Sequence, residues 1–156
     1  MLRRTTMPNW CINHIELSGP KDKIEELYTK AKQSDELLEH ISPIGAYDRD
    51  QAINQWGTKW DINPEGLDFV PDGDYSRIQG YFESAWSPPT EAVHTWLDNN
   101  PDCDAQLFFF EPAMDFAGSL DCQINLSEES DEYFTDTELG EQLDSHFSIL
   151  EYRAEE

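Results

Sequence analysis

Hydrophobic residues recur with a two-residue period in some parts of the chain and with a helical period in others. Residues 9–18 carry three apolar side chains on one parity and end at Gly19-Pro20, which predicts a first β-strand. Residues 20–34 place an apolar stripe between lysines and glutamates, which predicts a helix directly after that strand. A second helix is expected from about residue 89 to residue 99.

Five further strands are expected where short apolar runs lie between turn-forming residues: 58–62, 66–70, 78–86, 105–110 and 118–126. The strand over 78–86 has the clearest pattern, with alternate residues from Ile78 to Trp86 on one face. The last two strands should pair as a hairpin. Residues 35–57 are ambiguous, apart from a short helix over 50–56 that Gly57 would stop.

This order of elements predicts an α+β fold with a ferredoxin-like split βαβ antiparallel sheet. Two helices should cover one face, and an extra hairpin strand should extend the sheet. The other face should be solvated or covered by residues 35–57 and a C-terminal helix. We expect a mobile N-terminal extension over 1–6, a ferredoxin-like domain over 7–126, and an acidic segment over 127–156 docked on that domain.

The C-terminal segment is both acidic and amphipathic. Leu139, Leu143 and Phe147 are spaced four residues apart, which places them on one face of a helix. A short helix docked on the body through these residues would hold its carboxylates outward at fixed positions. The alternative is a solvated acidic tail, which is what blocks of like charge usually form.

Net charge narrows the classes of function. The 156 residues include 33 Asp and Glu against 10 Lys and Arg, a formal charge of −23. Direct binding to nucleic acid or to an anionic membrane is therefore electrostatically unfavourable. Apolar residues make up 38% and aromatic residues 12% of the chain, which favours a packed core over acidic disorder. No window has the apolar length of a membrane span.

The acidity is concentrated towards the C-terminus. Residues 1–34 hold six basic and four acidic side chains, so the excess of acid lies entirely in the rest of the chain. Eleven carboxylates lie between Glu128 and Glu156, where Arg153 is the only basic residue. This segment is the strongest candidate for a negative docking face.

The residues that usually carry chemistry form no recognisable motif. His14, His40, His94 and His146 stand in unrelated segments without zinc-ligand spacing. No nucleophile signature is present, and the paired aspartates at 48–50 and 72–74 are better explained by turns than by calcium loops. We therefore expect no catalytic residue, metal or cofactor.

The three cysteines indicate a compartment. Cys11, Cys103 and Cys122 form no C-x-x-C pair and lie in runs that are expected to be buried strands. We interpret them as small, reduced hydrophobic residues, which indicates a cytoplasmic protein.

Four separated motifs resemble a known family. They are Met7-Pro-Asn-Trp-Cys, Trp56-Gly-Thr-Lys-Trp-Asp61, Phe82-x-x-Ala-Trp-Ser-Pro-Pro89 and Glu111-Pro-x-Met-x-Phe-Ala-Gly118. In this order they resemble the Api-ninety-two-like family of small phage and plasmid proteins, over residues 7 to about 126. The resemblance implies a ferredoxin-like domain and a mobile-element origin. The family has no known function, so the resemblance implies no catalytic residue.

The tryptophans in these motifs have two interpretations. Trp56, Trp60 and Trp86 are expected to be buried anchors at strand ends and turns. Alternatively, some of them line a binding groove together with Tyr81 and Lys59, because exposed aromatic residues are enriched at binding hot spots.

These observations favour a non-enzymatic phage or mobile-element protein that binds and inhibits a basic host protein. Carboxylates held on a compact scaffold compete with nucleic acid for a basic groove, which would make the partner a nucleic-acid-binding protein of the host cytoplasm. The expected docking face consists of Glu128, Glu129, Asp131, Glu132, Glu138, Glu141 and Asp144, with Asp68, Asp72 and Asp74 as a second patch. Two alternatives are an assembly module that oligomerises through an open sheet edge and an enzyme without a recognisable motif.

Overall fold

The computed structural model describes residues 9–155, so the extension expected over residues 1–6 lies outside the described residues. Six strands form one antiparallel sheet with the order β2-β3-β1-β4-β5-β6. The strands are β1 (Trp10–Pro20), β2 (Leu67–Asp72), β3 (Tyr75–Ala85), β4 (Asp104–Glu111), β5 (Phe116–Ser119) and β6 (Cys122–Asn125). The α+β class expected from the sequence is confirmed.

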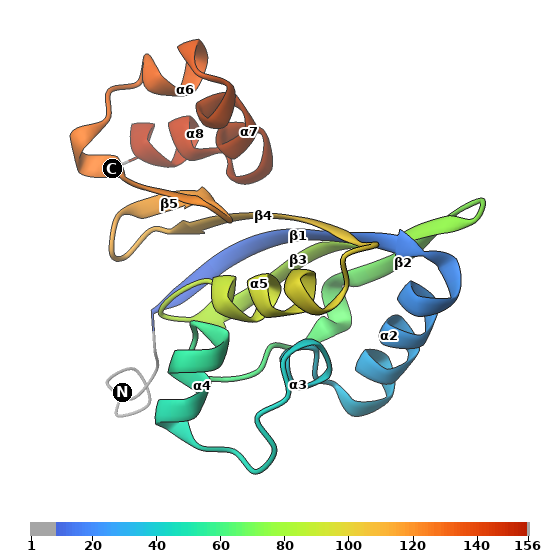
Figure 1. Cartoon of the computed structure of the whole chain (residues 1–156). Coiled ribbons are helices and arrows are strands. Elements are labelled where there is room, and N and C mark those ends of the chain that lie inside the picture. Colours follow the sequence, from blue (N-terminus) through green and yellow to red (C-terminus); the bar gives the residue numbers. More distant parts are fainter. Residues whose placement is uncertain (1–8, 156) are drawn as a thin grey trace.

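Helices lie on both faces of this sheet (Figure 1). The described residues form α2 (Lys21–Ser34), α3 (Leu38–Ile41), α4 (Arg49–Trp56), α5 (Thr90–Asn99), α6 (Tyr133–Asp136), α7 (Glu138–Phe147) and α8 (Ile149–Ala154), with short 3₁₀ helices η1 (Pro64–Gly66) and η2 (Leu126–Glu128). Helices α2 to α5 cover one face, and α6 to α8 stand on the other face over β4 and β5. No helix within residues 9–155 is long and apolar enough to cross a membrane.

The larger core lies between the sheet and helices α2 to α5. Alternate residues of β1, including Cys11, Ile15 and Leu17, are fully buried on this side, as the two-residue period predicts. Ile24 on α2 and Trp96 on α5 pack onto them. The first strand and both expected helices are therefore confirmed.

Three expectations for the connecting segments are wrong. Residues 58–62 form no strand, because the Thr58 side chain bonds the Ala85 carbonyl and the Asp61 carboxylate accepts four backbone N–H groups, which holds this segment as a loop. Residues 35–57 lie on the same face as α2 and α5, and they include the unexpected helix α3. The strand expected over 118–126 is two strands, β5 and β6, separated by a turn at Leu120-Asp121.

The end of helix α4 and the end of strand β3 are each set by a residue with positive φ. Gly57 ends α4 with a φ of 88°, a conformation that glycine adopts without steric cost. Trp86 has a φ of 71°, so β3 ends one residue earlier than the pattern from Ile78 to Trp86 predicts. The Trp86 side chain leaves the buried face as a result and is 45% exposed.

Candidate functional site

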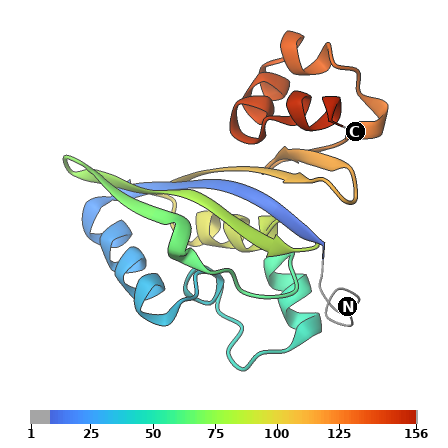
Figure 2. The ribbon, with the colours of Figure 1, turned by 180° about the vertical axis from the view of Figure 1, so that it is seen from behind.

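The acidic segment is a folded unit, which we call the C-terminal module (residues 126–155, comprising η2 and α6 to α8). Figures 1 and 2 show it stacked on β4 and β5, on the face opposite α2 to α5. A second hydrophobic cluster joins it to the sheet, in which Phe108 and Phe110 of β4 contact Phe134, Leu143 and Ile149 of the module. The alternative of a solvated tail is therefore wrong.

Local hydrogen bonds explain why the module adopts this fold. Thr137 caps α7, since its hydroxyl oxygen accepts the Gly140 N–H at 3.0 Å and donates to the Tyr133 carbonyl at 2.6 Å. Ser148 turns the chain with a φ of 52°, and the Asp144 carboxylate accepts the Leu150 N–H at 2.9 Å as α8 begins. The amphipathic helix expected from the sequence is confirmed as α7.

Seven of the ten expected docking residues lie in this module, and five of the seven are exposed. Its exposed carboxylates from the expected face are Glu128, Asp131, Glu132, Glu138 and Glu141. Glu129 and Asp144 are half-buried.

The single cation of the module is used internally. Arg153 Nη2 donates to the Glu129 carbonyl at 2.8 Å, and its Nε lies 3.4 Å from the Asp131 carboxylate. The guanidinium also lies over the Phe134 ring, 5.3 Å from its centroid. The negative charge of the module is therefore not balanced by a cation that projects outward.

The second expected patch lies at the opposite end of the molecule. Asp68 is on β2, the edge strand furthest from β6 in the sheet order, and Asp72 and Asp74 lie at the β2–β3 turn. All three are exposed. The hairpin that carries them projects away from the C-terminal module in both ribbon views (Figures 1 and 2). The structure therefore does not bring the two expected patches together.

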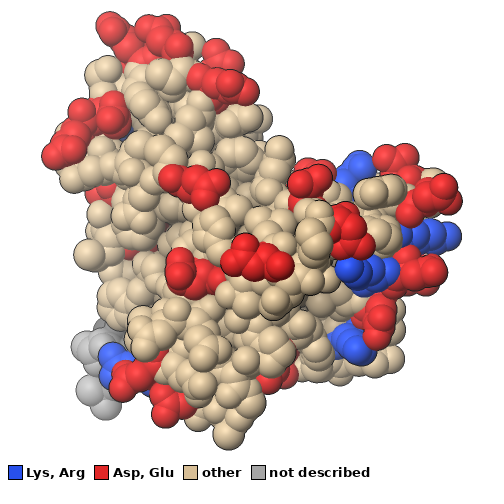
Figure 3. Space-filling model, viewed as in Figure 1, with Lys and Arg blue, Asp and Glu red and all other residues tan. Residues whose placement is uncertain are grey.

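Charge is distributed unevenly over the visible surface. In Figure 3, Asp and Glu gather along the top and the upper left edge of the molecule, where the C-terminal module lies, with almost no Lys or Arg among them. Further carboxylates cross the centre of this face. At the right-hand side, near α2, basic and acidic side chains alternate. Lys23 pairs there with Asp102 at 2.8 Å, and Lys30 pairs with Glu26 at 2.9 Å.

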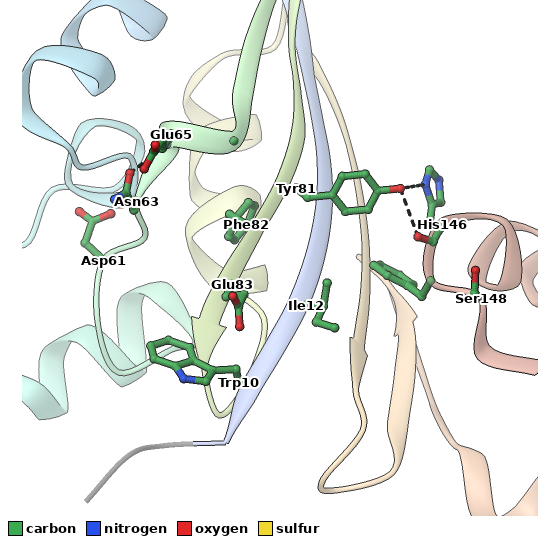
Figure 4. Close-up of a pocket in the computed structure, with 12 residues that line it drawn as sticks. Trp10, Ile12, Asp61, Asn63, Glu65, Tyr81, Phe82, Glu83, His146 and Ser148 are labelled. Atoms are coloured by element: carbon green, nitrogen blue, oxygen red, sulfur yellow. Dashed lines mark hydrogen bonds between the residues drawn. The ribbon is translucent and has the colours of Figure 1, made fainter. Parts of the chain in front are cut away.

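Beside the module lies a concave site, which we call the β3 groove. It has a volume of about 850 Å³ and lies between the loop at 61–66, the strands β1 and β3, and residues 146–148 of the module (Figure 4). Its exposed aromatic residues are Trp10 and Tyr81, which are 36% and 46% exposed. This volume is within the range of ligand-binding sites.

A cluster of rings joins the groove to the module. The His14 ring stacks on the His146 ring with a centroid separation of 4.3 Å, and His146 also stacks on Phe108 at 4.9 Å. The Tyr81 hydroxyl donates to the His146 carbonyl at 3.1 Å (Figure 4). Burial lowers the pKa of both histidines, and the proximity of His146 lowers the pKa of His14 further.

Of the three tryptophans singled out in the motifs, one is buried and two are exposed, and none of the three lines the β3 groove with Tyr81. Trp56 is a buried anchor, as expected, and its indole N–H donates to the Ser42 carbonyl at 2.8 Å. The expectation that Trp60 and Trp86 are also buried is wrong. Trp60 is 37% exposed, because the loop that carries it is held by backbone bonds to Asp61, and its ring lies near Trp10.

The three cysteines differ in burial. Burial raises the pKa of Cys11 to about 12, with a smaller effect of the nearby Glu111 carboxylate, and burial raises the pKa of Cys103 to about 11. Cys122 is exposed at the start of β6, so the expectation that it is buried is wrong. The strand split at Leu120-Asp121 places it beside a surface turn.

The buried carboxylates have structural partners. Glu111 is fully buried, and its carboxylate accepts the Ala113 and Met114 N–H groups at 2.9 and 2.8 Å. The exposed carboxylate of Asp48 also has a structural role, because it caps α4 by accepting the Gln51 N–H at 3.0 Å. No group of three or more metal-ligating side chains is found within residues 9–155.

Comparison with protein-family models, curated proteins and solved structures finds no match for this chain.

Proposed function

We propose that this protein is a non-enzymatic binding protein that inhibits a basic host protein by nucleic-acid mimicry. The observation that carries the proposal is the C-terminal module, which displays its carboxylates on packed helices and uses its one cation internally. A disordered acidic tail would lose conformational entropy when it binds, whereas the module is already ordered.

The spacing of carboxylates on the module supports mimicry. Glu138 and Glu141 are three residues apart on α7, which puts their side chains about 5–6 Å apart at Cβ. Duplex DNA also presents closely spaced negative charges, in its case phosphates. A basic protein that binds the module gains the ion pairs that it would otherwise form with phosphates.

The fold and origin proposed from the sequence fit this function. The order β2-β3-β1-β4, with α2 and α5 as connections on one face, supports a ferredoxin-like split βαβ core that β5 and β6 extend. The resemblance to the Api-ninety-two-like family stays a prediction. It supports a phage or plasmid origin and action in the host cytoplasm.

The sheet edges bear on the alternative of an assembly module, and the β3 groove bears on the alternative of an enzyme. The edge strand β2 contains Pro71 and the exposed Asp68 and Asp72, and the edge strand β6 is only four residues long. Proline, charge and short length disfavour pairing of these two edge strands with a second copy. The β3 groove is a concave pocket, and the histidine among its lining residues, His146, has its ring stacked on the rings of His14 and Phe108.

Capture of host proteins by the immobilised full-length chain tests the proposal. We expect a basic nucleic-acid-binding protein to be retained at about 50 mM salt and released at about 500 mM salt, because screening weakens exposed charge pairs. Double-stranded DNA should also release it, since DNA competes for the same cationic groove.

A matched pair of variants locates the binding face. The module variant replaces five exposed carboxylates by amides: Glu128, Asp131, Glu132, Glu138 and Glu141. The control variant replaces five exposed carboxylates outside the module: Glu25, Glu36, Asp50, Glu91 and Asp98. The proposal predicts loss of capture in the module variant alone. Equal capture by both variants, or capture that DNA and salt do not affect, would contradict it.

A further inference from the structure

The last five residues of β3 have a strand on one side only. β1 pairs with β3 along the whole length of β3, whereas β2 reaches β3 only as far as the Leu67–Gly80 pair. Residues 81–85 therefore have no neighbouring strand on their outer side. The loop over residues 58–66 contacts both ends of this stretch, because the Thr58 hydroxyl bonds the Ala85 carbonyl and Gly66 packs against the Tyr81 carbonyl, so only Glu83 is open. This edge faces the β3 groove, because Phe82 and Glu83 line the groove opposite the loop at 61–66 (Figure 4).

Hydrogen bonds at the end of β3 show which backbone groups point outward. In an antiparallel pair, the residues whose N–H and C=O face the partner strand alternate with residues whose groups face away. The Trp86 N–H donates to Asn9 on the β1 side, whereas the Ala85 carbonyl accepts the Thr58 hydroxyl on the outer side. By this alternation the N–H and C=O of Glu83 point outward, and neither has a hydrogen-bond partner within residues 9–155.

The walls of the groove are acidic and aromatic. The carboxylates of Glu65 and Glu83 are exposed at the groove, and no Lys or Arg of residues 9–155 lines it. The indole of Trp10 supplies an aromatic face beside Glu83 (Figure 4). A carboxylate next to an exposed indole is suited to a guanidinium or ammonium group, through an ion pair and a cation–π contact.

We infer that the β3 groove binds an extended arginine- or lysine-containing segment of the basic partner, which pairs with the edge of the sheet at Glu83. The free backbone groups of Glu83 bind the backbone of this segment, and Glu65, Glu83 and Trp10 bind its cationic side chains. Strand addition of this kind uses the backbone for affinity and alternate side chains for specificity. This inference rests on the proposed function, because it assigns a second contact to the same basic partner.

The dimensions of the groove fit such a segment. Alternate residues of an added strand project to the same face as Tyr81 and Glu83, so basic residues at every second position all reach the acidic face. The groove volume of about 850 Å³ accommodates several residues of an extended chain.

A synthetic peptide tests this inference with the full-length chain. The probe is a capped heptapeptide that alternates arginine and threonine, and its affinity is measured by isothermal titration calorimetry. Replacing arginine by the neutral isostere citrulline should weaken binding by about tenfold or more. Two further peptides carry methyl groups on the backbone nitrogens, one at the arginines and the other at the threonines, and both keep the charge. Because the backbone N–H groups of alternate residues face opposite sides, only one of these two peptides loses its hydrogen bond to β3 and should bind at least about tenfold more weakly.

Protein variants separate the groove from the module. Glu65→Gln with Glu83→Gln should weaken binding of the peptide by about tenfold, and the equally charged variant Glu138→Gln with Glu141→Gln by less than about threefold. Equal weakening by the two double variants, or equal affinity of the parent and both methylated peptides, would overturn the inference. Absence of peptide binding while the basic partner is still captured would overturn it and leave the proposed function standing. Failure of capture by the wild-type chain would instead contradict the proposed function.

Discussion

Leu143→Ala tests whether the C-terminal module is a packed unit that holds its carboxylates in place. Leu143 is fully buried in the hydrophobic cluster between the module and the sheet. Truncation to alanine removes buried methyl groups and leaves a cavity, and together these cost about 3 kcal/mol. The loss should fall on the module, because its cluster is separate from the larger core beneath α2 to α5.

Hydrogen exchange of the backbone amides, followed residue by residue, measures this change. A decrease of about 3 kcal/mol in the opening free energy accelerates exchange in α7 by about a hundredfold. Amides in the centre of β1 should change by less than about threefold. Leu139→Ala is the matched control, since Leu139 is half-buried on the same helix and should accelerate exchange by about tenfold or less. The reasoning is refuted if β1 accelerates as much as α7, or if Leu143→Ala has no larger effect than the control.

Three further predictions concern other parts of the structure. Asp61→Ala should lower the free energy of unfolding by about 3 kcal/mol, because four backbone N–H groups lose their acceptor; urea denaturation checks this, and a loss below about 1 kcal/mol would contradict it. Burial lowers the pKa of His14 and His146, so the unfolded chain binds more protons than the folded chain as the pH falls below 6.5. The free energy of unfolding of the wild type should therefore fall from pH 7 to pH 5, relative to a variant in which both histidines are changed to Gln. Parallel pH profiles of the two proteins would exclude this coupling. Maleimide should label Cys122 in the folded protein and Cys11 only after unfolding, as mass spectrometry of labelled peptides would show; rapid labelling of Cys11 would disagree with its burial and with its pKa of about 12.

Sequence periodicity was sufficient where the signal is local. The two-residue period of β1 and the four-residue spacing of Leu139, Leu143 and Phe147 each reflect which side of one element is buried. These patterns predicted the α+β class, α2, α5 and the docked helix α7. They could not predict Trp60 as exposed, because its loop is held by bonds between Asp61 and residues more than twenty positions away.

The site is less predictable than the fold because it depends on contacts between distant segments. The ring cluster joins His14 of β1 to His146 of α7, and neither histidine has a neighbouring motif that would indicate the contact. The part of β3 that has no strand on its outer side depends on where β2 begins, which is at Leu67. The composition of the preceding turn predicts the start of β2 only to within a few residues. The acidic residues were visible in the sequence, but their division between the module and the distant β2–β3 hairpin required the topology.

The salt dependence of binding to the captured partner is the most direct test of the central claim. The dissociation constant is measured for the wild-type chain, the module variant and the control variant between about 50 and 300 mM salt. If ordered carboxylates on the module replace phosphates, affinity falls steeply with salt for the wild-type and control chains, and the module variant shows a clearly shallower slope. The same slope for all three chains would contradict the account.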